Sequence, residues 1–515
     1  MTDTTLEWGL KLLGLKQEFK REFNVQASFG LSFVIMSPFV GLSGGLTYAW
    51  FVGGPGPASW GWAITSVLTL CTGLSLAEIL SGLPVSGGPY CWTALLGGRH
   101  GALLSWITGW ANYFGLTALT ASAALATMYN VAAVVQILTG VTVSPYQQLL
   151  ILQGILVIGG AVNSSSPILL TRCMFYGTFI NVAGVIFVVL LLPTVSPWRQ
   201  SPQFVFATFF DKSISPFIVP SNAYIWIQGV CLALFTMAGF DSCSHLSEEM
   251  KGANSSAPKA MIWSIMASST VGFALLVGVL FCVQSSDALF YSSATNGFAL
   301  GQLVFDVFNA RFGTGVWSVS VLFICILAGC MTTIACITST SRMLFSFARS
   351  KALPFSPFFS YMSQNHHMPI RTVWLSVTGP CIASILLFAP NPFLFGTMVS
   401  YGFAGQQLAH GLPIFCRLTI SRHTFEPGPI HLGKWSRTVG WISVAWIGVS
   451  MAILSFPASM PVTFEEVQLP LCLVLGGSLI SWYLPKYGAK NWFIDPKQQA
   501  ASAMQTPLLN HWQSA

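Results

Sequence analysis

Asp241 is an acidic residue inside an apolar stretch long enough to cross a membrane, at the end of the run Phe-Thr-Met-Ala-Gly-Phe-Asp. A carboxylate near the centre of a membrane helix costs about 3 kcal/mol, so it usually faces a protein interior or a watery cavity. Two roles fit Asp241: coupling to a proton or contact with a substrate, or an anchor that pairs with a basic residue such as Arg342.

His410, Gln406 and Gln407 are polar residues inside another apolar stretch. An imidazole changes its charge near neutral pH, so His410 is either a proton-linked switch or a buried neutral ring bonded to a neighbour. Glu78 lies near the end of a third stretch, where an ion pair that packs or gates is favoured over contact with a ligand. His410 and Glu78 therefore join Asp241 as candidates for coupling and gating, while the roles of Gln406 and Gln407 are left open.

His245, Glu248 and Glu249 follow Asp241 at a spacing that places all three on one helical face. Such a set can bind a metal ion, but no Cys or second His stands at a compatible distance in the sequence. The three residues therefore indicate a helix end beside a gate. We predict no metal site and no organic cofactor.

The elements that carry these residues are membrane helices. The chain has 515 residues, of which 53% are hydrophobic and only 7% charged, whereas a soluble domain has about 25% charged residues. The sequence predicts an all-α polytopic membrane protein. Apolar windows of about 20 residues give twelve spans, near 27–50, 60–82, 102–127, 147–163, 173–194, 223–243, 260–283, 316–340, 370–389, 393–416, 438–457 and 467–485.

The basic residues fix the predicted orientation. If both termini are cytosolic, all but Arg199, Lys212 and Arg311 of the 22 Lys and Arg residues lie on the cytosolic side, as the positive-inside rule requires. This asymmetry accounts for the net charge of +7 without a nucleic-acid partner. We expect a multi-pass protein of the plasma membrane, with the vacuolar or another internal membrane as the alternative; the oligomeric state is left open.

Two predicted spans, the first and the sixth, contain residues that tolerate a broken helix. The first has a proline, three glycines and two serines between Ser37 and Gly45, and the sixth has Gly239. Interrupted spans at matching positions of two halves point to a binding site at the membrane midplane. Close helix packing through small residues is the alternative for the first cluster.

The predicted domains follow from these spans. They are a cytosolic tail over 1–24, a transmembrane domain over 25–486 and a cytosolic tail over 487–515. The transmembrane domain divides into repeats over about 25–195 and about 222–416, followed by extra helices over about 438–485. The sequence has neither a GxxxxGK[ST] phosphate loop nor a nucleophile–base set, so ATP-driven pumping and enzymatic activity are disfavoured.

Several motifs resemble the amino-acid/choline transporter family of the amino acid–polyamine–organocation superfamily, which includes fungal choline and GABA permeases and plant bidirectional amino-acid transporters. The order and spacing of the motifs carry the resemblance, which covers about residues 13 to 492. The motifs lie at 75–79, 84–92, 239–249, 341–349 and 425–434. Gln406, Gln407 and His410 depart from the family, so the substrate of a relative does not transfer directly.

The resemblance implies a LeuT-like fold of ten core helices plus two. It further implies that Gly41, Ser43 and Gly44 contact a substrate, that Phe235 closes over it, and that Asp241 takes part in coupling.

Asn112, Thr236 and Gly239 complete the predicted substrate site. The expected function is secondary active transport of an amino acid or a related organic cation, such as GABA, choline or a polyamine, by alternating access. A proton is favoured as the coupling ion over sodium, for which hydroxyls at Thr332 and Thr333 would be the ligands. The alternatives are a nutrient sensor with a transporter fold and a facilitative exporter or exchanger of an amino-acid-derived metabolite.

Overall fold

A computed structural model describes residues 24–51, 53–210, 226–291, 293–295, 297–363, 368–388, 394–455, 476–486, 488–494 and 496. Every regular element within these ranges is a helix. The longer α-helices are α2 (Val25–Ile35), α3 (Pro38–Phe51), α4 (Pro55–Gly82), α6 (Gly101–Thr139), α7 (Pro145–Asn163), α8 (Pro167–Val195), α13 (Ala253–Leu280), α15 (Ala299–Phe312), α16 (Val319–Arg349), α18 (Ile370–Ser384), α19 (Leu394–Thr419) and α20 (Ser436–Ser455).

Short helices join or cap the long ones. They include α5 (Pro89–Leu96), α9 (Pro202–Ala207), α11 (Cys231–Thr236), α12 (Ser242–His245), α14 (Ser286–Tyr291), α17 (Ser356–Phe359), α23 (Gly477–Tyr483) and the 3-10 turn η3 (Ser247–Glu249). Proline begins many helices of the first half, where its missing N–H costs no hydrogen bond and its fixed φ suits the first helical position. These prolines define where the spans start.

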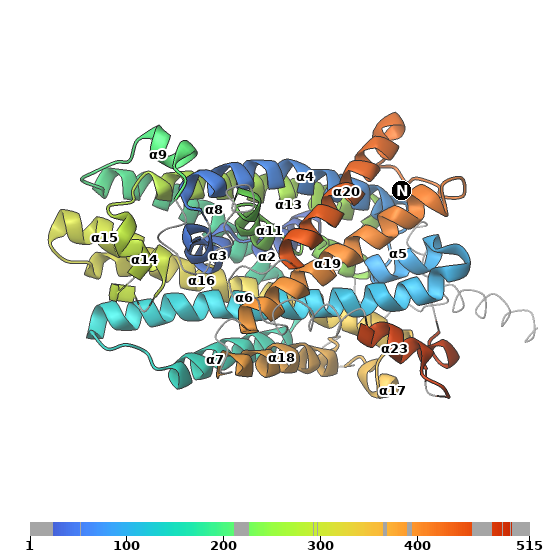
Figure 1. Ribbon diagram of the computed structural model, residues 1–515. Helices are drawn as coiled ribbons and strands as arrows, with labels where there is room; N and C mark the ends of the chain where they lie inside the picture. The colour runs from blue at the N-terminus through green and yellow to red at the C-terminus, as the bar shows by residue number, and fades with distance from the viewer. Residues whose placement is uncertain are drawn as a thin grey trace, which may run out of the picture.

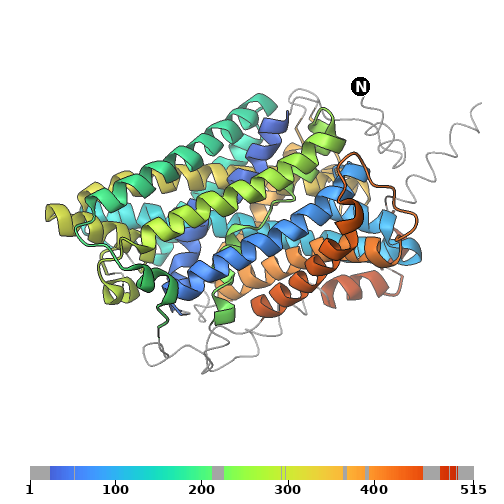
Figure 2. The same cartoon turned by 90° about the horizontal axis from the view of Figure 1, so that it is seen from above.

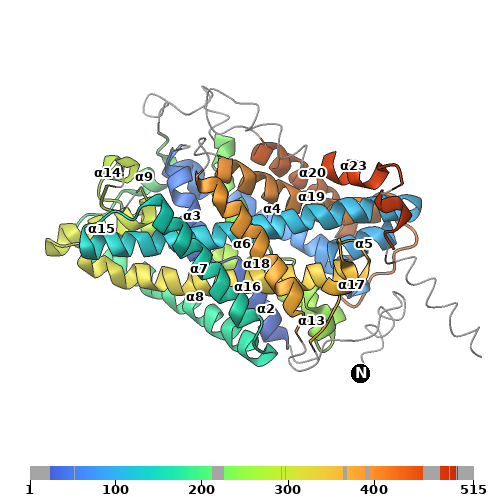
Figure 3. The ribbon, with the colours of Figure 1, turned by 90° about the horizontal axis from the view of Figure 1, so that it is seen from below.

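The helices form a bundle in which α2, α3 and α11 are enclosed. In Figure 1 these elements lie between α4 above and α6 below. Figure 2 shows α8, α13, α4 and α20 side by side as the covering layer on one face. Figure 3 shows α7 and α18 next to each other on the opposite face, over α6 and α16.

The two ends of the bundle carry different short helices. Figure 1 shows α5, α17 and α23 at one end, here called the α5 end, and α9, α14 and α15 at the other. The α5 end is the one that the distribution of basic residues predicts to be cytosolic. At this end, Trp492 and Phe493 of the predicted C-terminal tail pack against Trp106 of α6, with ring centroids 5.5 and 5.3 Å apart.

Both predicted helix interruptions are confirmed. α2 ends at Ile35 and α3 begins at Pro38, while α11 ends at Thr236 and α12 begins at Ser242. Gly239, in the second interruption, has φ +81°, a conformation that glycine adopts without strain. The two interrupted helices touch: the Ser32 hydroxyl donates to the Phe240 carbonyl at 3.1 Å and accepts from the Cys243 N–H at 3.2 Å.

The first interruption is shorter than the sequence suggested. It is confined to Met36 and Ser37, whereas the glycines that follow lie within α3, where the Gly41 N–H donates to the Ser37 carbonyl at 3.0 Å. These glycines allow α3 to approach α11, because a Cβ at Gly41 would overlap Thr236 and one at Gly45 would overlap Leu232. Close packing therefore explains Gly41 and Gly45.

Nine candidate membrane spans are present in the described part of the chain, the first comprising α2 and α3 together. The structure thus establishes a polytopic helical membrane protein. The predicted sixth span is divided between α11 and α12, and the predicted tenth, α19, which carries Gln406, Gln407 and His410, is not among the nine. Residues 467–475 of the predicted twelfth span lie outside the described residues, and the remainder contains α23, so the count of twelve stays a prediction.

Candidate functional site

Asp241 lies at the second interruption and is fully buried. Its Oδ1 is 3.2 Å from His410 Nε2 and its Oδ2 is 3.6 Å from His245 Nε2. Gln406 donates to Oδ1 at 3.5 Å, and the Phe240 ring lies 4.8 Å from the His410 ring. We call Asp241, His245 and His410 the carboxylate–histidine cluster; it places three groups able to exchange a proton in one enclosed space.

The suggested pairing of Asp241 with Arg342 is wrong. Arg342 Nε lies 3.1 Å from Glu249 Oε1, and its terminal nitrogens contact the Ser341 hydroxyl and the Met368 sulfur. A buried guanidinium is stabilised by a carboxylate of its own, and Glu249 supplies it. The partners of Asp241 are histidines, whose rings can either donate or accept a hydrogen bond according to their protonation, whereas a guanidinium only donates.

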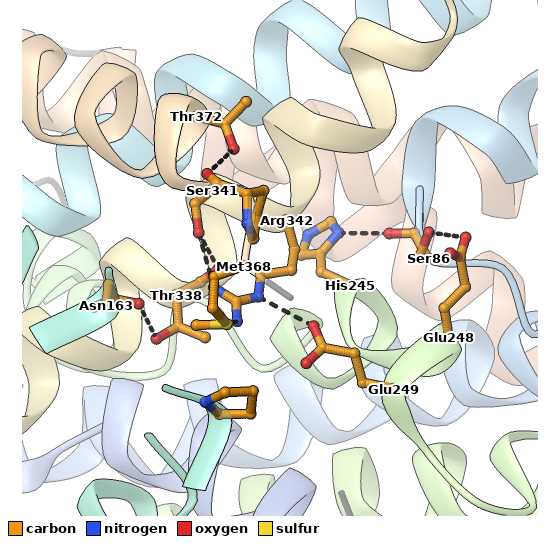
Figure 4. Close-up of polar contacts among 12 residues, drawn as sticks. Ser86, Asn163, His245, Glu248, Glu249, Thr338, Ser341, Arg342, Met368 and Thr372 are labelled. Carbon is orange, nitrogen blue, oxygen red and sulfur yellow. Dashed lines mark hydrogen bonds and ion pairs between the residues drawn. The ribbon is translucent and has the colours of Figure 1, made fainter. Parts of the chain in front are cut away.

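A second polar cluster lies between Asp241 and the α5 end. Arg349 is 2.6 Å from Glu248 and donates to the Ser86 hydroxyl at 3.1 Å, while Ser86 also donates to Glu248. Figure 4 shows the contact between Ser86 and Glu248 beside the pair formed by Arg342 and Glu249. We call Ser86, Glu248, Glu249, Arg342 and Arg349 the gate cluster, and it ties the loop before α5 and the turn η3 to α16.

Glu78 forms another ion pair near the same end. Its Oε2 lies 2.9 Å from Arg417 on α19, and its Oε1 accepts from the Leu432 N–H at 3.4 Å. Arg417 also lies over the Phe425 ring at 4.9 Å. Glu78 is therefore engaged by protein groups, which is the arrangement expected of the packing or gating pair.

Burial differs between the two sides of the interruptions. Every residue from Asp241 to Met250 is buried, which includes the whole segment leading from the second interruption to the α5 end. On the other side, Gly44 of α3 is exposed, and Val40 and Gly41 on the same helix face are half-buried. The structure thus describes a conformation whose centre is closed toward the α5 end.

The predicted substrate residues on α3 and α11 lie around this exposed face. The Ser43 hydroxyl accepts from Asn130 Nδ2 at 3.0 Å, and the Thr236 hydroxyl donates to the Leu232 carbonyl at 2.7 Å. Phe235 is half-buried, with its ring 5.0 Å from that of Phe403. Among these residues Gly44 is the most open, and substrate contact for all of them stays a prediction.

Asn112 on α6 is fully buried, and neither its Oδ1 nor its Nδ2 has a hydrogen-bond partner among the described residues. It lies one helical turn before Gly115, where a Cβ would come 2.6 Å from the Cβ of Gln406. An unpaired buried amide costs about 1–3 kcal/mol. Asn112 thus offers a donor and an acceptor on the face of α6 that meets α19.

The two glycines of α3 provide a matched pair of variants. Gly41→Ala is expected to destabilise the protein by about 1–3 kcal/mol, because the added methyl would overlap Thr236. Gly44→Ala should leave stability unchanged or raise it slightly, since its methyl would meet only Ala126, at 3.8 Å. Thermal unfolding of the purified variants measures both, and equal melting temperatures would contradict the assigned packing.

Hydroxyl groups satisfy the carbonyls of the first interruption. Thr332 donates to the Val34 carbonyl at 2.8 Å, and Ser268 donates to the Met36 carbonyl at 2.7 Å. Thr333 donates to Gly329 within its own helix at 2.9 Å. The hydroxyls suggested as sodium ligands therefore form hydrogen bonds within the protein.

Sequence reasoning missed two features of the site. His245 was assigned only to the gate, although its i, i+4 relation to Asp241 would have shown that the two side chains share a helical face. The ion pairs of Arg342, Arg349 and Arg417 join segments far apart in the sequence, and no local pattern specifies such partners.

Membrane-length helices with two interrupted helices meeting at an enclosed carboxylate define a membrane transport protein. Residues 23–478 match the family described as amino acid permease, and the chain belongs to that family. It is a transporter of the amino acid–polyamine–organocation superfamily and not an enzyme. The predicted family and the predicted class of function are thus confirmed.

The relatives are similar over nearly their whole length. The amino-acid permease BAT1 of Arabidopsis thaliana is 33% identical over 499 residues, which cover 95% of both chains. Its homolog in Oryza sativa subsp. japonica is 33% identical over 508 residues, covering 95% of this chain and 94% of the relative. The GABA-specific permease of Saccharomyces cerevisiae is 27% identical over 495 residues, covering 92% and 84%.

Proposed function

We propose that the protein is a proton-linked secondary active transporter of amino acids or related small organic cations, working by alternating access in a LeuT-like fold of twelve helices. The observation that carries the proposal is the position of Asp241, which is buried at the second interruption within 3.2 Å of His410. A carboxylate and an imidazole in contact can share a proton that neither would hold alone. Moving that proton changes the charge beside the interrupted helices.

The proposed coupling of transport to a proton follows from the free-energy cost of enclosing a net charge within the protein. Three titratable side chains fill the cluster, and the described ion pairs of Arg342, Arg349 and Arg417 go to Glu249, Glu248 and Glu78 instead. The net charge of the cluster therefore depends on its protons. A conformational change that exposes the cluster to the other side of the membrane would release or take up a proton there.

The substrate class rests on the family and on the interrupted helices. A broken helix offers N–H groups that suit a carboxylate and carbonyls that suit an ammonium group, and an amino acid carries both. One relative is a GABA-specific permease, so small amino acids, GABA and related cations such as choline and polyamines are the proposed substrates. Gly44 is the proposed point of closest backbone approach.

The gate cluster would close the site on the cytosolic side. Its two arginine–glutamate pairs join α16 to the segment between α12 and α13, and would have to separate before substrate could leave in that direction. In the proposed orientation both termini are cytosolic, and the exposed Gly44 lies on the side of the interruptions that faces away from the cytosol. The plasma membrane is the proposed location, with an internal membrane as the alternative.

Transport should proceed without sodium. The carbonyls of Val34 and Met36, which a cation could otherwise bind, already accept hydrogen bonds from Thr332 and Ser268. Replacing sodium with N-methyl-D-glucamine at a constant proton gradient should leave the initial uptake rate unchanged. A strict sodium requirement would contradict this assignment of the hydroxyls.

Uptake by a transporter-deficient host tests the function. Labelled amino acids, GABA, choline and a polyamine would be offered at two external pH values, with and without sodium. We expect concentrative uptake of at least one amino-acid-type substrate that is faster at the more acidic pH. Uptake of no member of the panel by protein shown to reach the membrane would refute the proposed substrate class.

A further inference from the structure

His245 lies between the carboxylate–histidine cluster and the gate cluster and contacts both. Its Nε2 is 3.6 Å from Asp241 Oδ2, and its Nδ1 is 3.4 Å from the carbonyl oxygen of Ser86. The ring is 1% exposed. Figure 4 shows its contact with Ser86, whose hydroxyl in turn reaches Glu248. A continuous line of contacts therefore runs from Asp241 to the ion pair of Glu248 and Arg349.

The loop that carries Ser86 is shaped to fit this ring. Gly88 has φ +57°, which favours glycine, and a Cβ there would lie 2.6 Å from the Ser244 hydroxyl and 3.1 Å from His245 Cε1. The missing side chain leaves room for the imidazole. The position of the loop and the position of the ring are therefore coupled by packing as well as by the Ser86 contact.

The chemistry of the two contacts makes them depend on a proton. A carbonyl oxygen only accepts, so the contact with Ser86 requires hydrogen on Nδ1. In neutral His245 this leaves a lone pair on Nε2 facing the Asp241 carboxylate, which is repulsive. One additional proton, shared between Nε2 and Oδ2, makes both contacts favourable. When this proton leaves, the neutral ring can keep either the contact with Ser86 or the contact with Asp241, but not both.

We propose that His245 is a positioning residue that transmits the protonation of Asp241 to the gate cluster, an inference that rests on the proposed proton-linked function. In the protonated state His245 holds the Ser86 loop, and through it the pair of Glu248 and Arg349. Loss of the proton releases the loop and favours opening at the α5 end. Among the described residues, the other titratable or charged groups nearby are His410, which shares Asp241, the thiol of Cys243 beside Asp241, and the pair of Glu249 and Arg342.

Two variants separate the contacts of His245. In His245→Asn the amide nitrogen can occupy the place of Nδ1 and donate to Ser86 without reaching Asp241. In His245→Gln the longer side chain can place its amide at Nε2 and donate to Asp241 without contacting Ser86. Neither amide titrates, so both variants should lose the dependence of the gate on pH while retaining a polar side chain.

Cys91 on α5 reports whether the gate is open. Cys91 is 2% exposed, and its sulfur packs directly against Gly87 in the loop before α5. Burial raises the pKa of its thiol to about 12, so the thiol is unreactive in the closed conformation. Its alkylation in full-length protein would be followed by mass spectrometry at about pH 6 and about pH 8, either side of the usual histidine range. Dividing each rate by that of denatured protein at the same pH removes the intrinsic reactivity of the thiol.

In the wild type, the corrected alkylation rate should rise about tenfold from the acidic to the basic condition, as expected for loss of one charge-assisted hydrogen bond. His245→Asn should be slow at both pH values and His245→Gln fast at both. A merely structural role for His245 would instead make both variants fast and leave a pH dependence in each.

Proton-driven uptake by the wild type, measured alongside, separates the two proposals. If uptake is proton-driven but Cys91 shows no corrected pH dependence, or the variants keep it, the role of His245 is refuted and the proposed function stands. If wild-type uptake ignores the proton gradient, the proposed function fails and the role of His245 fails with it.

Discussion

Asp241→Asn should strongly reduce proton-driven uptake while leaving the protein folded. The substitution keeps the size of the side chain but removes the charge that His410 and His245 contact at 3.2 and 3.6 Å. A hydrogen bond to a charged group contributes about 1.5–3 kcal/mol, so we expect uptake driven by a proton gradient to fall about 10- to 100-fold. Initial rates in reconstituted vesicles, normalised to the amount of inserted protein, measure the effect.

Asp306→Asn is the matched control for this substitution. Asp306 is on α15 at the opposite end of the bundle from α5, and its Oδ1 accepts from Gln302 Nε2 at 2.7 Å. An amide can replace a carboxylate there without touching either cluster, so uptake should stay near the wild-type rate. If Asp241→Asn also retained the wild-type rate and pH profile, Asp241 would be a structural residue and the coupling role would be refuted.

Arg342→Met should have the largest effect on stability. Arg342 is 1% exposed, and its removal leaves the buried carboxylate of Glu249 without its guanidinium partner. Breaking a buried ion pair in this way costs about 3–5 kcal/mol. We expect a markedly lower melting temperature in detergent and a lower yield of folded protein.

The double variant Arg342→Met/Glu249→Leu should recover most of that loss, because two apolar side chains can replace a buried pair at little cost. Arg311→Met is the control: Arg311 is exposed near the end of α15, and its replacement should leave the melting temperature unchanged. If the double variant were as unstable as Arg342→Met alone, the energetic importance of the pair would be contradicted.

Much of the fold could be predicted because the stability of a helix in a membrane depends on the residues of that helix itself, which are read from one stretch of sequence. Long apolar runs must form helices that satisfy their own backbone groups, and nine of the expected spans are present in the described residues. The sequence did not predict the structure within the first interrupted helix. The sequence shows that Ser37 to Gly45 can break a helix, but whether Gly41 is unwound or packed depends on Thr236, a residue on another helix.

The site was predictable in position and only partly in its contacts. Asp241 and His410 were identified singly because each is costly in an apolar span, and the structure brings them within 3.2 Å. Their pairing could not be predicted, since it depends on how α19 packs beside the second interruption. The partner suggested for Asp241, Arg342, was wrong for the same reason: nearby Glu249 offers an equal charge, and only tertiary geometry decides between them.

In the proposed mechanism, the carboxylate–histidine cluster links substrate movement to a proton. The most direct measurement is the internal pH of proteoliposomes that contain the purified protein, recorded when substrate is added without sodium and without an imposed proton gradient. Substrate entry should acidify the interior of wild-type vesicles, and Asp241→Asn vesicles should show no such acidification. Substrate entry into wild-type vesicles with no change of internal pH would contradict it.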